Sequence, residues 1–371
     1  MSGLLATLAA TALAAWAPTH VQLGLASQPG GAAHVRALHA GWRYQYLTGG
    51  ANTGTGWRTW NPDGTFVSKY VAESRAAGRT PVFTYYQLLP SKGTNNGGEA
   101  ERDLSNIDNT TLMKAYYDDL ALALRRAHAA AEGRLVVLHV EPDFWGYVQQ
   151  RAQEDPASVP AAVASTGDPR LQGLPDTVPG FAQAIVRLRD ALAPEVRLGY
   201  HLSTWGTRTD PVLQDPSLPQ VDRLAARSAT FYTNLHARFD LIFSDPSDRD
   251  DGFKAKVLHD GGKGRWTAGD YRRDERWLGD VHAATKLPIA MWQIPLGNVR
   301  LGNTANHYRD THVQQLLGNP ATLEAYAHAG VIALLFGGGA PGTTSERTDG
   351  GLFARLAARY ARGGGVPTRR G

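Results

Sequence analysis

The sequence predicts an α/β fold in one domain, a closed (β/α)8 barrel of the TIM type. Two observations lead to this prediction: eight short apolar runs occur between residues 21 and 360, and helical patterns lie between most of them. Parallel strands that are covered by helices on the outside have this alternating pattern. The chain has 371 residues, of which 42% are hydrophobic, so it is long enough and apolar enough to form one large barrel.

The eight runs have the length and composition of buried strands. Several are apolar without a strict alternation of polar and apolar residues, which is typical of parallel strands buried on both faces. In chain order they are 21–27, 42–48, 81–89, 134–143, 196–205, 239–245, 288–294 and 331–338. Eight strand-then-helix units favour a barrel.

The clearest helical pattern lies between the third and fourth runs. Residues 110–133 place apolar side chains at helical spacing and end at Gly133, a residue type that commonly terminates helices. Further helices are predicted at 180–194, which stops at Pro194, and at 321–330. The alternative is an open, doubly wound sheet, but residues 27–31 lack the Gly-x-Gly-x-x-Gly turn of nucleotide-binding sheets.

The two ends of the chain differ from the barrel, which we assign to residues 21–362. Residues 1–20, with the apolar run 4–17, predict a signal peptide or an N-terminal helix, so we expect a secreted or periplasmic protein. No Lys or Arg precedes the run, and Pro18 directly follows the small residues that fit a cleavage site. Residues 363–371 are rich in Gly, Pro and Arg and are expected to form a flexible tail.

The composition excludes several kinds of chemistry. The chain contains no cysteine, which rules out thiol catalysis and cysteine-based metal sites. It has no His-Glu-x-x-His or Gly-x-Ser-x-Gly motif, and we expect neither a metal nor another cofactor. The net charge of +4 is small and dispersed, so nucleic acid is not an expected partner. The run 4–17 is too short to span a membrane, and we expect a monomer.

Polar residues gather after the predicted strands, at the end where a TIM barrel carries its active site. The opposite strand ends are plain. The candidates at these ends are Gln87, Glu99, Glu141, Asp143, His201, Asp245 and Gln293. The charged run 248–251 is interpreted as a solvated loop, because it lacks the spacing of a calcium-binding loop.

Glu141 and Asp143 stand two positions apart at the end of the fourth predicted strand. Side chains two apart in a strand project from one face, so we expect both carboxyl groups in the barrel mouth, about 6–7 Å apart. Asp245, two strands further on, supplies a third carboxylate. Carboxyl groups whose pKa values differ through burial and mutual charge suit acid–base cleavage of an acetal. The alternative is that Glu141 or Asp143 pairs with an arginine or caps a loop.

Tryptophans accompany these carboxylates. Flat aromatic rings stack on the apolar faces of sugar rings, while polar side chains bind the hydroxyl groups. We expect Trp145, Trp205 and Trp292 to line sugar-binding positions, with packing in the core as the alternative for each. The matching candidates for polar contacts with the substrate are Gln87, Glu99, His201 and Gln293.

Residues 136–149, VVLHVEPDFWGYVQ, resemble the strand that carries the Glu-Pro-Asp motif of glycoside hydrolase family six, the cellobiohydrolases and endoglucanases. The preceding stretch is similar in layout, with a strand at 81–90, a loop at 95–99 and a helix at 110–133. The resemblance covers residues 81–149. It implies a barrel glycosidase with Asp143 as the general acid and a β-glucan-like polysaccharide or oligosaccharide as the substrate.

The chain also departs from that family. The aspartate-rich stretch that supplies an assisting carboxylate in the family is replaced by Gln-Leu-Leu-Pro-Ser-Lys at 87–92, and the family's disulfides are absent. The family implies inversion at the anomeric carbon, which this sequence leaves open.

We therefore predict a glycoside hydrolase with three catalytic carboxyl groups. Asp143 protonates the leaving oxygen, Glu141 assists it or exchanges roles with it, and Asp245 is the base or the nucleophile. Two alternatives remain. One is a carbohydrate-binding barrel without catalysis. The other is a metal-dependent phosphodiesterase that uses Glu141, Asp143 and His201.

Overall fold

The computed structural model describes residues 16–368. Its centre is a closed barrel of eight parallel strands in chain order, in which the eighth strand pairs with the first. The strands are β1 (Gln22–Ala26), β2 (Trp42–Leu47), β3 (Thr80–Tyr85), β4 (Val136–Val140), β5 (Val196–His201), β6 (Leu241–Ser244), β7 (Ile289–Ile294) and β8 (Val331–Phe336). The predicted barrel is confirmed, and each predicted run contributes one strand.

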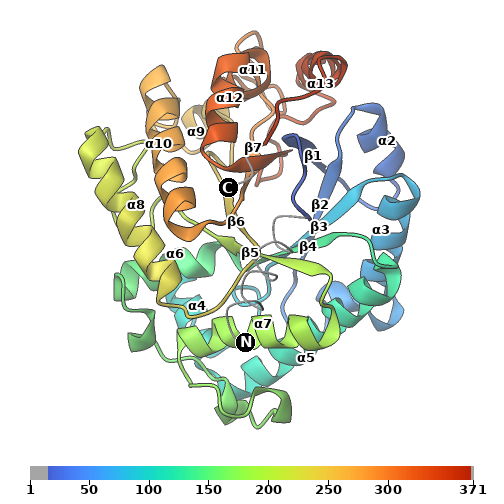
Figure 1. Ribbon diagram of the computed structural model, residues 1–371, viewed down its shortest axis with the longest axis vertical. Helices are drawn as coiled ribbons and strands as arrows, with labels where there is room; N and C mark the ends of the chain where they lie inside the picture. The colour runs from blue at the N-terminus through green and yellow to red at the C-terminus, as the bar shows by residue number, and fades with distance from the viewer. Residues whose placement is uncertain (1–15, 369–371) are drawn as a thin grey trace, which may run out of the picture.

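Helices form a ring around the strands (Figure 1). They are α2 (Ala32–Ala37), α3 (Thr65–Ala76), α4 (Glu99–Ile107), α5 (Thr110–Ala131), α6 (Pro142–Ala152), α7 (Val178–Leu192), α8 (Leu218–Thr233), α9 (Asp251–Val257), α10 (Ala268–Thr285), α11 (His312–Gly318), α12 (Pro320–His328) and α13 (Leu352–Arg362). Short 3-10 helices occupy η1 (Trp57–Thr59), η2 (Pro62–Gly64), η3 (Pro156–Ser158), η4 (Ala164–Thr166) and η5 (Pro169–Leu171).

Local sequence explains where the longest helix begins and ends. The side chain of Asn109 accepts a hydrogen bond from the backbone N–H of Leu112 at 3.0 Å, which caps the first turn of α5. The chain leaves the helix through Glu132 and Gly133, both with positive φ. The helices predicted at 110–133, 180–194 and 321–330 are therefore confirmed as α5, α7 and α12.

The interior of the barrel is packed with side chains from alternate strand positions. Phe243 stacks flat on His139 with ring centroids 4.1 Å apart. This stacking needs Gly199, because a Cβ there would lie 2.3 Å from the Phe243 ring. The other inner residues are Trp42, Tyr44, Val82, Val137, Leu241, Ala290, Trp292, Ile332, Ala333 and Leu335. The filled barrel is a rigid floor under whatever its mouth binds.

The two ends of the described chain lie side by side. Backbone hydrogen bonds join Val21 to Val366 at 2.9 Å and Thr368 to Thr19 at 3.0 Å. Residues 366–368, which the sequence assigns to a flexible tail, are thus hydrogen-bonded to residues 19–21. Residues 1–15, most of the predicted signal peptide, lie outside the described residues.

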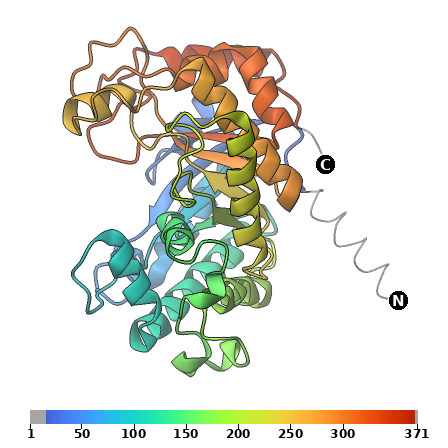
Figure 2. The same cartoon turned by 90° about the vertical axis from the view of Figure 1, so that its left-hand side faces the viewer.

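Figure 2 shows α4 and α9 extending from the same end of the barrel. These two helices follow β3 and β6, so the end from which they extend is the carboxyl end of the strands. Within residues 16–368, no helix has the length and the apolar character needed to cross a membrane.

Candidate active site

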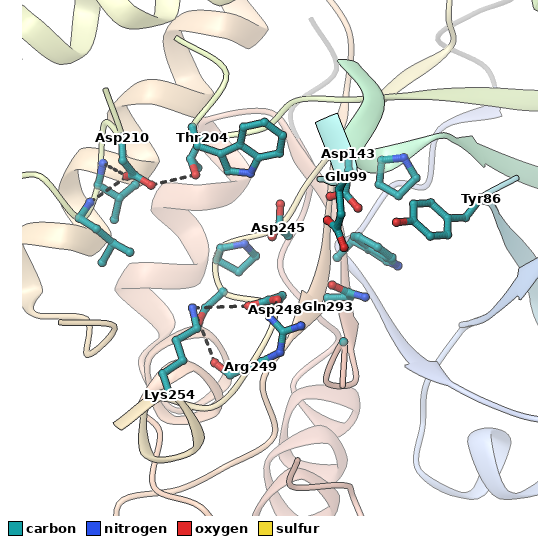
Figure 3. A pocket seen from close by; sticks show the side chains of 18 of the residues that line it. Tyr86, Glu99, Asp143, Thr204, Asp210, Asp245, Asp248, Arg249, Lys254 and Gln293 are labelled. Carbon is teal, nitrogen blue, oxygen red and sulfur yellow. Dashed lines mark hydrogen bonds and ion pairs between the residues drawn. The ribbon is translucent and has the colours of Figure 1, made fainter. Parts of the chain in front are cut away.

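A cavity of about 590 Å³ opens at the carboxyl ends of the strands (Figure 3). Segments that end or follow seven of the eight strands, β2 to β8, contribute to its wall. The charged, aromatic and amide side chains of the wall include Tyr46, Tyr86, Glu99, Asp143, Trp205, Asp245, Asp248, Arg249, Lys254, Trp292 and Gln293. The cavity therefore lies at the end of the barrel where TIM barrels carry their active sites.

The expectation that Glu141 and Asp143 share one face of a strand is wrong. Strand β4 ends at Val140, Glu141 has a left-handed conformation with φ 45°, and α6 begins at Pro142. A proline has no N–H and a fixed φ, so it suits the first position of a helix rather than the interior of a strand. Asp143 lies in the first turn of α6 and lines the cavity, whereas Glu141 does not.

Glu141 instead holds the loop that follows β3. Its side chain is 1% exposed and accepts hydrogen bonds from the backbone N–H groups of Gln87 at 2.9 Å and Leu88 at 3.3 Å. Burial raises its pKa to about 8, although these two hydrogen bonds act in the opposite direction. Burial also raises the pKa of Asp103 well above its usual range, and the charge of Glu141 adds to this effect. The geometry therefore matches the alternative in which Glu141 caps a loop.

This burial makes the stability of the fold depend on pH. The folded-state pKa of Glu141 is about 8, above the value of 4.5 for a free glutamate. Its contribution to stability is thus complete below pH 4.5 and is lost as the pH rises toward 8, at no more than about 1.4 kcal/mol per pH unit. We expect Glu141→Gln to remove this loss, because an amide oxygen still accepts both backbone N–H groups but does not ionise.

Urea unfolding of the wild type and of Glu141→Gln at pH 5, 6, 7 and 8 measures this effect. The free energy of unfolding of the variant should rise relative to that of the wild type at each step. The matched control is Glu324→Gln, which makes the same change on the exposed surface of α12. Two curves that stay parallel over this range would show that Glu141 does not ionise with a raised pKa.

Asp143 has the electrostatic surroundings of an acid. Burial raises its pKa to about 6, opposed in part by the positive charge that His201 can carry. The carboxylates Asp245 and Glu99 raise the pKa further, while a hydrogen bond from Tyr86 lowers it. A carboxyl group that keeps its proton close to neutral pH is able to donate it to a leaving oxygen.

Asp245 contacts the buried His201, and His201 in turn contacts a second buried histidine, His139. His201 Nε2 lies 3.1 Å from Asp245 Oδ1, and His201 Nδ1 lies 3.0 Å from His139 Nε2. The third link joins His139 Nδ1 to the hydroxyl of Thr84 at 3.5 Å. Burial lowers the pKa of His139 well below its usual range.

The directions of these hydrogen bonds follow from the two tautomers. A neutral imidazole has one N–H donor and one acceptor nitrogen. If Thr84 donates to His139, then His139 Nε2–H donates to His201, and His201 Nε2–H donates to Asp245. This direction requires Asp245 to be an acceptor, which an ionised carboxylate is. Asp143 and Asp245 therefore differ in their surroundings: burial favours the protonated form of Asp143, and Asp245 lies against His201.

Two of the three tryptophans proposed for sugar stacking line the cavity. Trp205 is half-buried and packs against Tyr147, with ring centroids 4.9 Å apart. Trp292, on β7, lines the cavity floor and meets His139 edge to face at 4.8 Å.

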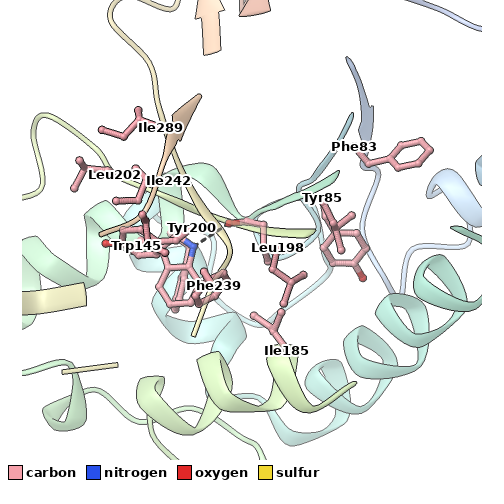
Figure 4. Close-up of a cluster of buried hydrophobic side chains, with 14 of the residues drawn as sticks. Phe83, Tyr85, Trp145, Ile185, Leu198, Tyr200, Leu202, Phe239, Ile242 and Ile289 are labelled. Atoms are coloured by element: carbon pink, nitrogen blue, oxygen red, sulfur yellow. Dashed lines mark hydrogen bonds between the residues drawn. The ribbon is translucent and has the colours of Figure 1, made fainter. Parts of the chain in front are cut away.

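The expectation for Trp145 is wrong, because its side chain is fully buried between the barrel and the helix ring (Figure 4). Its indole N–H donates to the backbone oxygen of Val140 at 2.9 Å, and its ring packs against Phe181 and Tyr200. The turn into α6 points Trp145 outward from the barrel, two residues after Asp143. It is a core residue, the alternative that the sequence also allowed.

Of the polar residues proposed to contact the substrate, some line the cavity and one is buried elsewhere. Glu99 and Gln293 line the cavity, and Gln293 donates a hydrogen bond to the hydroxyl of Tyr46. Gln293 has φ 52°, an unfavourable conformation for a residue other than glycine, and it lies at an irregularity in the pairing of β7 with β8. Gln87 does not reach the cavity: it is fully buried, and its side-chain oxygen accepts from the backbone N–H of Gly50 at 2.6 Å.

The solvated-loop interpretation of residues 248–251 is wrong for Asp250, which is buried, and it did not foresee that Asp248 and Arg249 line the cavity. Asp248 and Arg249 line the cavity, and Asp250 is 1% exposed and accepts backbone N–H groups from Gly297 and Thr344. The physical reason is that this loop follows β6 across the barrel mouth before α9 begins. Its position directly after a strand end is the sequence signal that was available for these cavity residues.

Sequence reasoning also missed Tyr46, Tyr86 and Lys254 as cavity residues. No group of three or more His, Asp or Glu side chains between residues 16 and 368 is arranged to hold a metal ion. Glu141 in particular points away from Asp143 and His201, so the three residues named for a metal-dependent phosphodiesterase do not converge.

Comparisons with known proteins agree with the architecture. No protein-family model matches the chain, and no curated protein matches it in sequence. Among solved structures, it is similar to a modular endo-β-1,4-mannanase from Cellulomonas fimi, described as a glycoside hydrolase of family 26. The TM-score is 0.54 at 12% identity, over 94% of this chain and 72% of that one. An engineered protein matches with a TM-score of 0.52 at 11% identity, over 94% of this chain and 70% of that one.

At these identities the similarity shows the fold alone. The chain is a (β/α)8-barrel protein with a carboxylate-lined cavity at the carboxyl end of its strands, and glycoside hydrolases are among the proteins that share its barrel. Glycoside hydrolase family six is not specifically favoured, since no family model matches the chain and the similar mannanase belongs to family 26.

Proposed function

We propose that the protein is a glycoside hydrolase that cleaves a polysaccharide or oligosaccharide. The observation that carries the proposal is the presence of Asp143 and Asp245 in one cavity, with burial favouring the protonated form of Asp143 and with His201 Nε2 3.1 Å from Asp245 Oδ1. Hydrolysis of a glycosidic bond needs one carboxyl group of each kind.

In the proposed reaction, Asp143 gives its proton to the leaving oxygen. Asp245, as a carboxylate, either removes a proton from the attacking water or attacks the anomeric carbon itself. His201 is a positioning residue: its Nε2–H fixes the orientation of the Asp245 carboxylate, and His139 fixes the tautomer of His201. Trp205 and Trp292 offer ring faces and edges to the sugar.

A panel of polysaccharides and their oligosaccharides tests the proposal, with β-glucans first and mannans, xylans and uronic-acid polymers beside them. Products are separated and identified for the wild type and for Asp143→Asn together. We expect turnover of at least one member by the wild type alone. Binding to a member without turnover by either protein would contradict the proposal and favour a carbohydrate-binding barrel.

The role of His201 has its own test. A hydrogen bond to a charged group contributes about 1.5–3 kcal/mol, so we expect His201→Ala to lower kcat by roughly 10- to 100-fold. KM should change little, because the variant misplaces the Asp245 carboxylate and leaves the sugar-binding side chains of the cavity in place.

A loss in kcat at an unchanged KM separates positioning from a loss of folding. His201→Gln keeps an N–H donor on a side chain of similar length and should recover part of the activity. If His201→Gln recovers none of the activity that His201→Ala loses, His201 acts only through packing.

A further inference from the structure

Three charged side chains form a cluster on one wall of the cavity, opposite the wall that carries Asp143 and Glu99 (Figure 3). Asp248 and Arg249 belong to the loop after β6, and Lys254 lies on α9. Arg249 Nη1 pairs with Asp248, and Lys254 Nζ lies 3.6 Å from Asp248 Oδ1 and donates to Ser247 Oγ at 2.9 Å.

The cluster has an excess of positive charge. It contains two cations and one carboxylate, and among residues 16–368 neither Arg249 nor Lys254 pairs with another acidic side chain. The side chains of Arg249 and Lys254 are only 32% and 16% exposed, so water screens their charges incompletely. Two partly buried cations that share one carboxylate are incompletely neutralised, and a ligand of opposite charge completes the neutralisation.

The guanidinium of Arg249 also has N–H groups that make no hydrogen bond within residues 16–368. A guanidinium carries five N–H groups, and Arg249 uses one of its nitrogens, in the pair with Asp248. The planar fork of a guanidinium matches the two oxygens of a carboxylate or a sulfate. Two other carboxylates line the cavity beside the cluster: Asp210 accepts the backbone N–H groups of Val212 and Leu213, and Asp245 contacts His201.

We infer that the substrate is an acidic glycan, whose sugar carries a carboxylate or a sulfate that binds Arg249 and Lys254. This inference rests on the proposed function. It places the anionic substituent on the α9 side of the cavity while the glycosidic bond lies between Asp143 and Asp245. A neutral sugar offers only hydroxyl groups there and leaves the positive charge uncompensated, and an amino sugar adds to it.

Binding of monosaccharides tests this inference without requiring any turnover. Calorimetry compares hexuronic acids and sulfated hexoses with the parent hexose and hexosamine, on the wild type, Arg249→Gln and Arg249→Lys. We expect the wild type to bind at least one acidic sugar about 10- to 100-fold more tightly than the hexose. Arg249→Gln should lose this preference, and Arg249→Lys, which keeps the charge without the fork, should keep part of it.

Arg151→Gln is the matched control, because Arg151 is exposed at the end of α6 and does not line the cavity. Separate carboxylate and sulfate arms show which group is bound, and raising the salt concentration should weaken the binding. Equal or tighter binding of the hexose or hexosamine would overturn the inference, as would an acidic preference that survives Arg249→Gln. If the inference fails in this way but the wild type hydrolyses neutral glycans, the proposed function still stands. If the wild type binds acidic sugars but hydrolyses no glycan, the inference about the ligand stands and the proposed function fails.

Discussion

Asp143→Asn should lower kcat on a natural glycan by about 10²- to 10⁴-fold, the range that a general acid contributes. Asparagine keeps the size of the side chain and the entry into α6 but has no acidic proton for the leaving oxygen. The fold should be unaffected, because Asp143 has no salt bridge in residues 16–368 that would be broken. Steady-state kinetics on the best substrate of the panel measures the effect.

The leaving group supplies the control for this result. An aryl glycoside whose phenol leaves readily needs little protonation, so Asp143→Asn should slow it far less than the natural glycan. Asp108→Asn makes the same change at an exposed position after α4 and should behave as wild type. Equal losses on both substrates would mean that Asp143 is not the acid.

The dependence of the rate on pH should also report the ionisation of Asp143. The pKa of Asp143 is raised to about 6, and the acid must be protonated to act, so activity should fall as the pH rises through about 6. This basic limb should disappear in Asp143→Asn, which has no proton to lose there.

The fold could be predicted from the sequence because strand burial leaves a strong pattern. Strands β4, β6, β7 and β8 are buried along their whole length, and each of the eight strands is separated from the next by a polar, glycine- or proline-containing connection. The carboxyl ends of parallel strands meet on one side whatever the loops do. Asp143, Trp205, Asp245 and Gln293 could therefore be placed in one cavity without any knowledge of loop shape.

The direction of side chains at the strand ends could not be predicted in the same way. Period two holds only while the strand continues, and β4 stops one residue before Glu141. A single residue in a left-handed conformation then turns Glu141 and Trp145 away from the cavity and keeps Asp143 in it. In the sequence, only Pro142 indicates that the strand ends here and a helix begins.

Contacts between residues that lie far apart in the sequence could not be predicted either. His139 and His201 are 62 positions apart and belong to neighbouring strands, where the register brings their rings to within 3.0 Å. The sequence places His201 at the barrel mouth and His139 inside the predicted strand 134–143. Only the structure shows that His139 contacts His201 and that His201 contacts Asp245, with Trp292 packed against both rings.

Asp245→Ala should be as damaging as Asp143→Asn, with a loss of about 10²- to 10⁴-fold in kcat, because it removes the base or nucleophile and leaves the acid in place. The loss should extend equally to aryl glycosides, since a good leaving group does not replace the attacking side. This difference in leaving-group dependence assigns the two carboxyl groups to opposite faces of the sugar.

Azide should restore turnover to Asp245→Ala, which gives the experiment a gain of activity to measure. Alanine leaves space beside the anomeric carbon, and a small anion that enters it attacks from the face of Asp245, so the glycosyl azide should have the configuration opposite to that of the substrate. The first product of the wild type, followed by NMR, then decides the role: an inverted sugar makes Asp245 the base that activates water, and a retained one makes it the nucleophile. An azide product with the configuration of the substrate would place Asp245 on the side of the leaving group and exchange its role with that of Asp143.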